Sequence, residues 1–187
     1  DEFYILTNED AKNFKLMVTP VARTAHRYWK EVLPERRDVM IEGLDEFKDY
    51  LVIYERKDAL RQIRIRNLAD NSDRYIEFDE PVYTAYGGSN PNYDTPTLQF
   101  SYYSLITPRS VYDYSFATGE RTLLKQGEVL GGYDPLQYQA ERLYATASDG
   151  TKIPISMVHK KGIKLDGNNP LYLYGYGSYG ITMDPWF

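Results

Sequence analysis

The chain has 187 residues, enough for one large domain or two small ones, and 42% of them are hydrophobic, which suffices for a core. Its formal net charge of −5 argues against nucleic acid as a partner, because nucleic-acid-binding proteins carry a basic face. The absence of cysteine excludes a disulfide framework, a thiolate zinc site and a cysteine nucleophile. The absence of cysteine is also compatible with a reducing compartment, and we expect a cytoplasmic protein.

The sequence as given shows no signal-peptide pattern at its start and no apolar run of membrane-spanning length. The first ten residues, DEFYILTNED, are acidic and lack the basic-then-apolar pattern of a signal peptide. No apolar run approaches the roughly 20 residues that cross a bilayer, so we expect no membrane partner. Because the chain starts and stops abruptly on strand-like stretches, we expect an internal fragment of a longer protein.

The first two thirds of the chain predict short strands separated by turns. The 19 tyrosines and 7 phenylalanines favour β structure, since aromatic residues pack well on pleated surfaces. Residues 21–33 are ambiguous between a loop and a short helical turn. The expected strands cover residues 3–7, 14–19, 39–44, 50–55, 62–67, 74–78, 82–86, 98–105, 110–116 and 121–125.

One predicted strand alternates strictly. In the segment QIRIRN, Ile63 and Ile65 fall on one face, and Arg64 and Arg66 fall on the other. This period of two is typical of a half-buried strand with its arginines toward solvent.

The spacing of these strands indicates a β-propeller. Residues 39–78 and 82–125 each hold about four strands in roughly 40 residues, the size of one blade. We therefore expect a mostly β fold, with roughly two and a half blades over residues 1–126. A Gly- and Pro-containing linker follows over residues 127–140.

The character of the chain changes after the linker, and residues 141–187 are expected to start a second domain. Residues 141–147 and 152–159 predict an antiparallel hairpin around Asp149-Gly150. Residues 171–174 predict a third strand that runs into the segment YGYGSYG.

Most of the polar residues carry no recognisable catalytic pattern. There is no G-x-S-x-G nucleophile elbow, and Gly177 directly precedes Ser178 instead of lying two positions before it. His26 and His159 read as surface or structural residues. No metal-ligand or phosphate-loop spacing is present, so we expect no metal and no cofactor. Carboxylate pairs in predicted turns are expected to be solvated: Asp45 with Glu46 and Asp79 with Glu80.

The segment YGYGSYG is the distinctive cluster. Gly175 and Gly177 permit positive φ and close backbone approach. A phenol held on such a turn, as at Tyr176, can donate a hydrogen bond to a developing oxyanion. Packing of these aromatic residues at a domain interface is the alternative, and the residues alone favour it.

The sequence resembles the prolyl oligopeptidase family, closest to its oligopeptidase B branch. The segments ERLYATASDGTKIPISMVHKK and NPLYLYGYGSYG are similar to the start of that family's peptidase domain. Upstream, TNEDAKNFKLMVTP, IEGLDEFKDYLVIYERKDALRQIRI and LQFSYYSLITPRSVYDYSFATGERTLLKQ resemble its later propeller blades.

The resemblance implies the C-terminal blades of a propeller followed by the first strands of an α/β-hydrolase domain. It implies a serine protease that cleaves short peptides, in this branch after Arg or Lys. Tyr176 matches the family's oxyanion-hole tyrosine, with Gly175 and Gly177 in the same loop. The catalytic triad would lie downstream, so this piece alone should be inactive and would need the remainder of its catalytic domain as partner.

Two other functions stay open at this point. A non-catalytic propeller could bind a protein partner. A prolyl, acylaminoacyl or dipeptidyl peptidase could use the same scaffold.

Overall fold

The computed structural model describes residues 1–187, which form two compact units, residues 1–76 and 77–187. The secondary structure is thirteen strands and three short 3-10 turns, as expected for a mostly β fold. The strands are β1 (Glu2–Thr7), β2 (Lys15–Pro20), β3 (Lys30–Leu33), β4 (Val39–Glu46), β5 (Tyr50–Lys57), β6 (Leu60–Asn67), β7 (Asp73–Tyr75), β8 (Tyr83–Gly87), β9 (Thr97–Ser104), β10 (Ser110–Ser115), β11 (Arg121–Gln126), β12 (Tyr138–Thr146) and β13 (Lys152–Lys160). The 3-10 turns are η1 (His26–Tyr28), η2 (Pro135–Gln137) and η3 (Ser178–Gly180).

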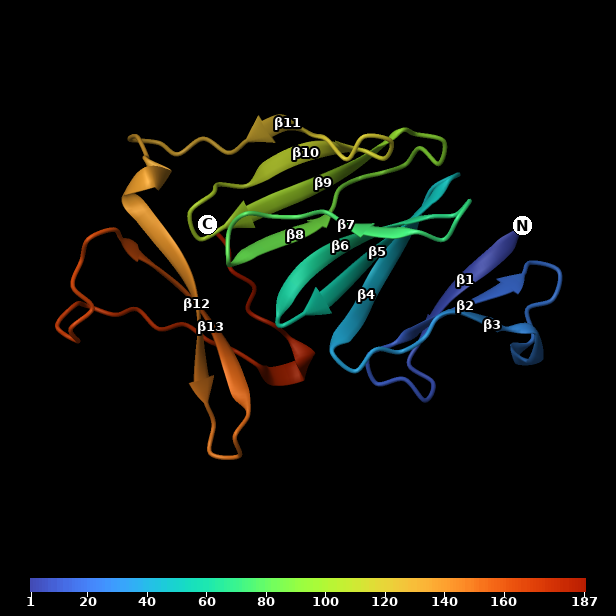
Figure 1. Cartoon of the computed structure of the whole chain (residues 1–187), viewed down its shortest axis with the longest axis horizontal. Coiled ribbons are helices and arrows are strands. Elements are labelled where there is room, and N and C mark those ends of the chain that lie inside the picture. The colour runs from blue at the N-terminus through green and yellow to red at the C-terminus, as the bar shows by residue number, and fades with distance from the viewer. The chain divides into compact units, whose positions relative to one another are not determined.

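The first unit holds two antiparallel sheets. Strands β1, β2 and β3 form a three-stranded sheet, and β4 to β7 form a four-stranded sheet in chain order (Figure 1). Within each sheet, each strand pairs with the next one along the chain, the up-and-down order expected of a propeller blade. The segment that was ambiguous in the sequence, residues 21–33, contains η1 and the short strand β3.

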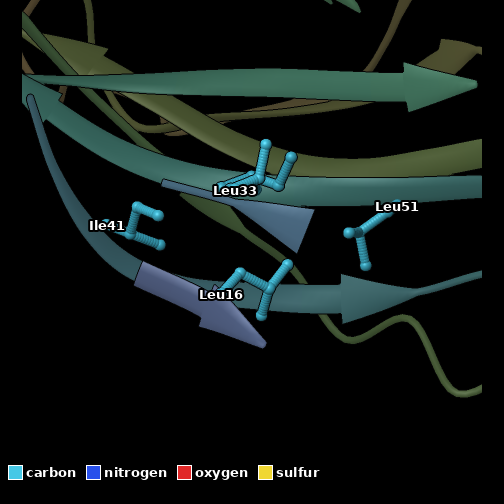
Figure 2. Packing of buried hydrophobic residues seen from close by; sticks show 5 residues of the cluster. Leu16, Leu33, Ile41 and Leu51 are labelled. Carbon is cyan, nitrogen blue, oxygen red and sulfur yellow. The ribbon is translucent and has the colours of Figure 1, made fainter. Parts of the chain in front are cut away.

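The core of the first unit joins these two sheets. Leu16 of β2 and Leu33 of β3 pack with Ile41 of β4 and with Leu51 and Ile53 of β5 (Figure 2). Each of the five side chains is at most 4% exposed. Burial of one such side chain contributes about 1.5–3 kcal/mol, so this cluster is a main source of the unit's stability.

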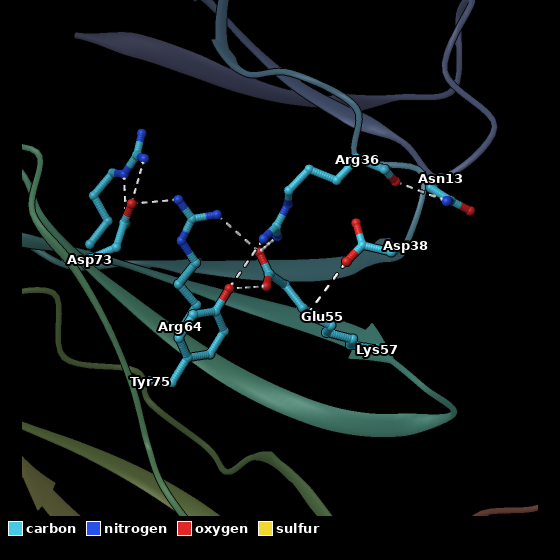
Figure 3. Close-up of polar contacts among 9 residues, drawn as sticks. Asn13, Arg36, Asp38, Glu55, Lys57, Arg64, Asp73 and Tyr75 are labelled. Carbon is cyan, nitrogen blue, oxygen red and sulfur yellow. Dashed lines mark hydrogen bonds and ion pairs between the residues drawn. The ribbon is translucent and has the colours of Figure 1, made fainter. Parts of the chain in front are cut away.

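The strand with the alternating QIRIRN pattern differs from its prediction. Ile63 and Ile65 are buried as expected, but Arg64 is also buried, at 9% exposure. Its guanidinium lies against Glu55 of the adjacent strand β5, a side chain with no exposed surface (Figure 3). The prediction that this arginine faces solvent is therefore wrong, because a buried carboxylate neutralises it.

The second unit contains a four-stranded sheet and a separate hairpin. Strands β8 to β11 again follow chain order, and β12 pairs only with β13. Aromatic rings fill one face of the four-stranded sheet: the ring of Phe78 stacks on Tyr102 at 4.9 Å and contacts Tyr83 at 4.6 Å. These contacts explain part of the high aromatic content.

The predicted third strand of the second domain does not form. Residues 171–174 have no strand pairing, and their side chains are between 61% and 87% exposed. A strand needs a neighbour for its backbone hydrogen bonds, and within this chain no segment pairs with this one in a sheet. Of the three strands expected after the linker, the chain therefore forms the two of the hairpin β12–β13. The proposed linker over residues 127–140 contains η2.

Two further observations concern membrane-spanning helices and clusters of metal-ligand residues. No helix of the structure has the length and apolar character that crossing a membrane requires. No group of three or more His, Cys, Asp or Glu side chains is arranged to hold a metal ion.

Candidate functional site

Tyr176 lies on a long exposed segment. Every residue from 160 to 183 is exposed, and Tyr176 itself is 48% exposed. Upstream, the rings of Tyr172 and Tyr174 are stacked with centroids 6.4 Å apart, so these alternate residues share one side of the segment. The phenol of Tyr176 is accessible to a reactant, and packing within this chain does not bury it.

The glycines beside Tyr176 both have negative φ. Gly177 has a φ of −152°, and Gly175 is likewise not among the residues with positive φ. A Cβ added at either position would meet nothing within 4 Å. Neither glycine therefore uses the positive φ that its lack of a Cβ permits, and no close backbone approach to them occurs within this chain.

The residues with positive φ in this segment come after Gly177. Tyr179 has φ +56° and Gly180 has φ +69°, both within η3. The side chain of Tyr179 is 95% exposed, so no packing compensates for its left-handed backbone. This conformation costs a non-glycine residue about 1 kcal/mol, which marks the turn after Tyr176 as locally strained.

The two histidines are paired with carboxylates. His26 Nε2 lies 2.7 Å from Glu9, and His159 Nε2 lies 2.9 Å from Glu141. His159 Nδ1 also faces the Lys160 carbonyl at 2.8 Å. The hydrogen bond to Glu141, aided by that carbonyl, raises the pKa of His159. Neither imidazole is hydrogen-bonded to a serine, so the structure assembles no nucleophile and base from these residues.

The carboxylate of Glu55 is the centre of a buried polar network in the first unit. Arg36, Arg64 and Tyr75 all donate to it, with Arg64 Nη1 at 3.2 Å and the Tyr75 hydroxyl at 2.8 Å (Figure 3). Arg64 Nη2 also contacts Asp73 at 2.5 Å. All of its partners belong to the protein, so the network stabilises a blade and leaves no oxygen of Glu55 free for a substrate.

Glu80 forms a comparable network in the second unit, although the sequence suggested a solvated turn residue. It accepts hydrogen bonds from the hydroxyls of Tyr102, Ser104 and Thr107. Burial and the neighbouring carboxylate raise the pKa of Tyr102, so this phenol stays a donor. The prediction that Glu80 is simply solvated is wrong, because three hydroxyls replace its water.

The turn held by Glu80 also anchors the linker. The hydroxyl of Tyr133 donates a 2.7 Å hydrogen bond to the carbonyl of Ile106, which lies in that turn. The ring of Tyr133 stacks on Tyr138 at 5.5 Å. Burial, with the nearby Tyr138 second in effect, raises the pKa of the Tyr133 phenol and keeps its proton in place.

Sequence reasoning missed one contact that concerns the Tyr176 segment. The Thr84 hydroxyl on β8 donates a 2.6 Å hydrogen bond to the carbonyl of Pro185. The partners are 101 positions apart, and Thr84 reads as an ordinary strand residue in VYTAY. No motif or periodicity could have found this pair.

This arrangement can donate hydrogen bonds but cannot perform nucleophilic catalysis by itself. It offers an accessible phenol at Tyr176 on a segment that is fixed at its far end. A serine, a histidine base and an orienting carboxylate are not brought together within residues 1–187. Any catalysis by the Tyr176 phenol therefore depends on groups supplied from outside this chain.

Comparison with known proteins identifies the fold. The family model described as "Prolyl oligopeptidase, N-terminal beta-propeller domain" matches residues 1–127. Dipeptidyl aminopeptidase BI of Pseudoxanthomonas mexicana is 42% identical over the whole chain, and Protease 2 of Moraxella lacunata is 36% identical. The chain spans 26% of the length of each of these relatives.

Solved structures agree with this assignment. Oligopeptidase B from Leishmania major superimposes with a TM-score of 0.89 at 35% identity, and covers 100% of this chain with 27% of its own. Oligopeptidase B from Trypanosoma brucei, solved with covalently bound antipain, gives a TM-score of 0.89 at 36% identity, with 100% and 28% coverage. The matches include residues 128–187, beyond the propeller model.

Proposed function

This chain belongs to the prolyl oligopeptidase family, and on that premise we propose that it is part of a serine peptidase that hydrolyses short peptides after Arg or Lys. The observation that carries the proposal is the match over the whole chain to oligopeptidase B structures, including the segment that holds Tyr176. Nucleophile, base and orienting carboxylate would come from the remainder of the catalytic domain, which belongs to an α/β-hydrolase fold in this proposal.

The proposed role of the propeller is to restrict access. Residues 1–126 supply its last blades, residues 127–140 connect them to the peptidase domain, and that domain starts near residue 141. A propeller that caps the active site would admit short peptides and exclude folded proteins. Peptides with a basic residue are the proposed substrates, and the rest of the catalytic domain is the proposed partner.

Tyr176 is the proposed catalytic residue of this chain. When a serine attacks the scissile carbonyl, the carbonyl oxygen gains negative charge, and a hydroxyl aimed at it stabilises the transition state. Its accessible position on a loop supports this role, since a donor buried in packing could not reach a reactant. Gly175 and Gly177 flank it, and with no neighbour within 4 Å they leave space for a substrate or for the rest of the domain.

A second specificity has its own support. The relative named dipeptidyl aminopeptidase BI is 42% identical, more than Protease 2 at 36%. The same scaffold could therefore remove dipeptides from a free N-terminus. A blocked N-terminus separates the two activities, because an oligopeptidase accepts it and an aminopeptidase does not.

Substrate assays of the intact protein test the proposal. We expect cleavage of N-blocked fluorogenic dipeptides with Arg or Lys before the scissile bond, and inhibition by a serine-directed phosphonate. Cleavage of only unblocked dipeptides would favour the dipeptidyl activity, and cleavage of only proline substrates would favour a prolyl peptidase. No cleavage of any of these would point to a non-catalytic propeller that binds a protein partner.

The location in the cell is also a proposal. The sequence has no cysteine, which suits the reducing cytoplasm. Fractionation of cells that express the intact protein tests this, and recovery from the periplasm or medium would contradict it.

A further inference from the structure

The end of the chain is attached at a single buried point. After Phe116, Pro185 is the only buried residue of the structure. Its carbonyl accepts the 2.6 Å hydrogen bond from the hydroxyl of Thr84, a side chain that is 1% exposed. The red C-terminal end consequently lies beside β8 in Figure 1. An exposed segment of more than twenty residues is thus fixed at its end by a buried contact.

The hydrogen bond from Thr84 favours the arrangement in which Pro185 lies beside β8. Thr84 is too buried to exchange its hydrogen bond for one to water, and a buried hydroxyl left without an acceptor is unfavourable. The carbonyl of Pro185 supplies that acceptor. Movement of Pro185 away from β8 would therefore leave the Thr84 hydroxyl without a partner.

A ring contact of Phe187, two residues after Pro185, also holds the end of the chain in place. The ring of Phe187 meets the ring of Tyr133 at 5.2 Å and 75°, an edge-to-face arrangement. Tyr133 is itself held by its hydrogen bond to Ile106 in the turn between β9 and β10. The segment is thereby connected to the same sheet through two independent contacts.

This attachment lies close to Tyr176 along the chain. Pro185 follows Tyr176 by nine positions, and part of that length is taken up by η3, which the 3.1 Å hydrogen bond from Ile181 N to Ser178 O closes. A short connection with a closed turn limits how far the tyrosine can move from the fixed point. A donor to an oxyanion must be held to well within 1 Å, so such a limit has catalytic consequences.

We propose that Thr84 is a positioning residue for the oxyanion loop, acting on Tyr176 through its hydrogen bond to Pro185. The inference rests on the proposed role of Tyr176. It gives Thr84, a residue of strand β8 that belongs to no motif, a part in catalysis without contact to the substrate. Thr84 and Tyr176 thereby become thermodynamically linked.

Kinetics of Thr84→Val in the intact protein test the proposal. Valine keeps the volume and removes the hydroxyl, and we expect kcat to fall about 10-fold with KM unchanged, less than the loss of a donor itself. Thr84→Ser should restore most of kcat. A peptide aldehyde, which forms a tetrahedral adduct, should bind about 10-fold more weakly to Thr84→Val, while the matching peptide alcohol should bind equally well.

A matched control is available in the first unit. Thr19 is also 1% exposed, and its hydroxyl donates a 2.6 Å hydrogen bond to the carbonyl of Arg23. Thr19→Val removes the same type of bond from the first unit, at a position remote from Tyr176 in the sequence. We expect a comparable loss of stability with kcat unchanged, so Thr84→Val kinetics equal to those of Thr19→Val would overturn the proposal.

A double variant separates this inference from the proposed function. On a Tyr176→Phe background, Thr84→Val should lower kcat no further, and a full additional loss would show that Thr84 acts by another route. If Tyr176→Phe lowers kcat and Thr84→Val does not, only the positioning role fails. If Tyr176→Phe has no effect, the oxyanion role fails first. Should Thr84→Val not fold, Phe187→Leu loosens the same attachment, and an unchanged kcat there would count against it.

Discussion

The hydroxyl of Tyr75 donates a 2.8 Å hydrogen bond to Oε2 of Glu55, a carboxylate with no exposed surface. Arg36 and Arg64 bring positive charge to the other oxygen of the same carboxylate. Arg36 belongs to the connection between β3 and β4, whereas the other partners lie in the four-stranded sheet. The network therefore ties the connection between the two sheets of the first unit to the four-stranded sheet through one buried negative charge.

Replacement of Glu55 should be far more costly than loss of the Tyr75 hydroxyl. Glu55→Gln removes the buried negative charge that Arg36 and Arg64 share and leaves Arg64 only Asp73 as its counter-charge, at about 3 kcal/mol or more, whereas Tyr75→Phe removes one donor at about 1–2 kcal/mol. Urea unfolding of the intact protein measures both. Tyr112→Phe, at a ring that stacks on Phe100 at 5.5 Å, is the control. Equal effects of Glu55→Gln and the control would contradict the network's role.

The stability contributed by Asp73 should disappear at low pH. Burial opposes ionisation of this carboxyl, but hydrogen bonds from Arg66 and Arg64 outweigh it and hold its pKa at about 2, below the ordinary 3.8. Its contribution is therefore complete above pH 4 and is lost as pH falls toward 2.

Thermal unfolding of the intact protein and Asp73→Asn checks this. The difference in Tm should be constant from pH 5 to 7 and shrink between pH 4 and 2. Asp38→Asn is the control, since its pair with Lys57, 3.4 Å apart and largely exposed, should contribute little. A Tm difference for Asp73→Asn that persists at pH 2 would be inconsistent with the lowered pKa.

Glu80 should stabilise both its turn and the linker. Glu80→Ala leaves the fully buried Ser104 hydroxyl without its acceptor and should cost about 2 kcal/mol. Because the same turn offers the Ile106 carbonyl to Tyr133, residues 127–140 should also become easier to cleave. Limited proteolysis of the intact variant measures this, with Glu77→Ala as the control. Equal cleavage rates in the two variants would argue against the connection.

The hairpin β12–β13 should weaken as pH rises above neutrality. The hydrogen bond to Glu141 raises the pKa of His159, so the charged pair is complete below about pH 6.5 and is lost as pH rises through the folded-state pKa. The Tm difference between the intact protein and Glu141→Gln should be larger at pH 6 than at pH 9. A difference that grows with pH would show that the pair does not act in this way.

The blades could be predicted from sequence because their signals are local. Alternating strands such as β6 and polar turns between them follow from side-chain periodicity, and the order of strands then follows from short connections. What periodicity could not show is which polar residues are buried. In the sequence, Arg64 and Glu80 look like surface residues. The structure shows otherwise, because Arg64 pairs with Glu55 and Glu80 accepts hydrogen bonds from three hydroxyls.

The candidate site was predictable in part for the same reason. The YGYGSYG segment is conspicuous in sequence, and the structure places Tyr176 on an accessible loop. The strand before it could not be judged from residues 171–174 alone, because a strand exists only with its neighbour. The Thr84–Pro185 contact joins residues far apart in the chain and has no local signal.

The most direct test of the account is the turnover of Tyr176→Phe in the intact protein on an N-blocked Arg substrate. Removal of the phenol oxygen should lower kcat by about 10²-fold or more with little change in KM, the scale of losing one oxyanion donor. Thermal unfolding should be unchanged, because the side chain is exposed. An unchanged kcat/KM would contradict the assignment of Tyr176 as the oxyanion donor.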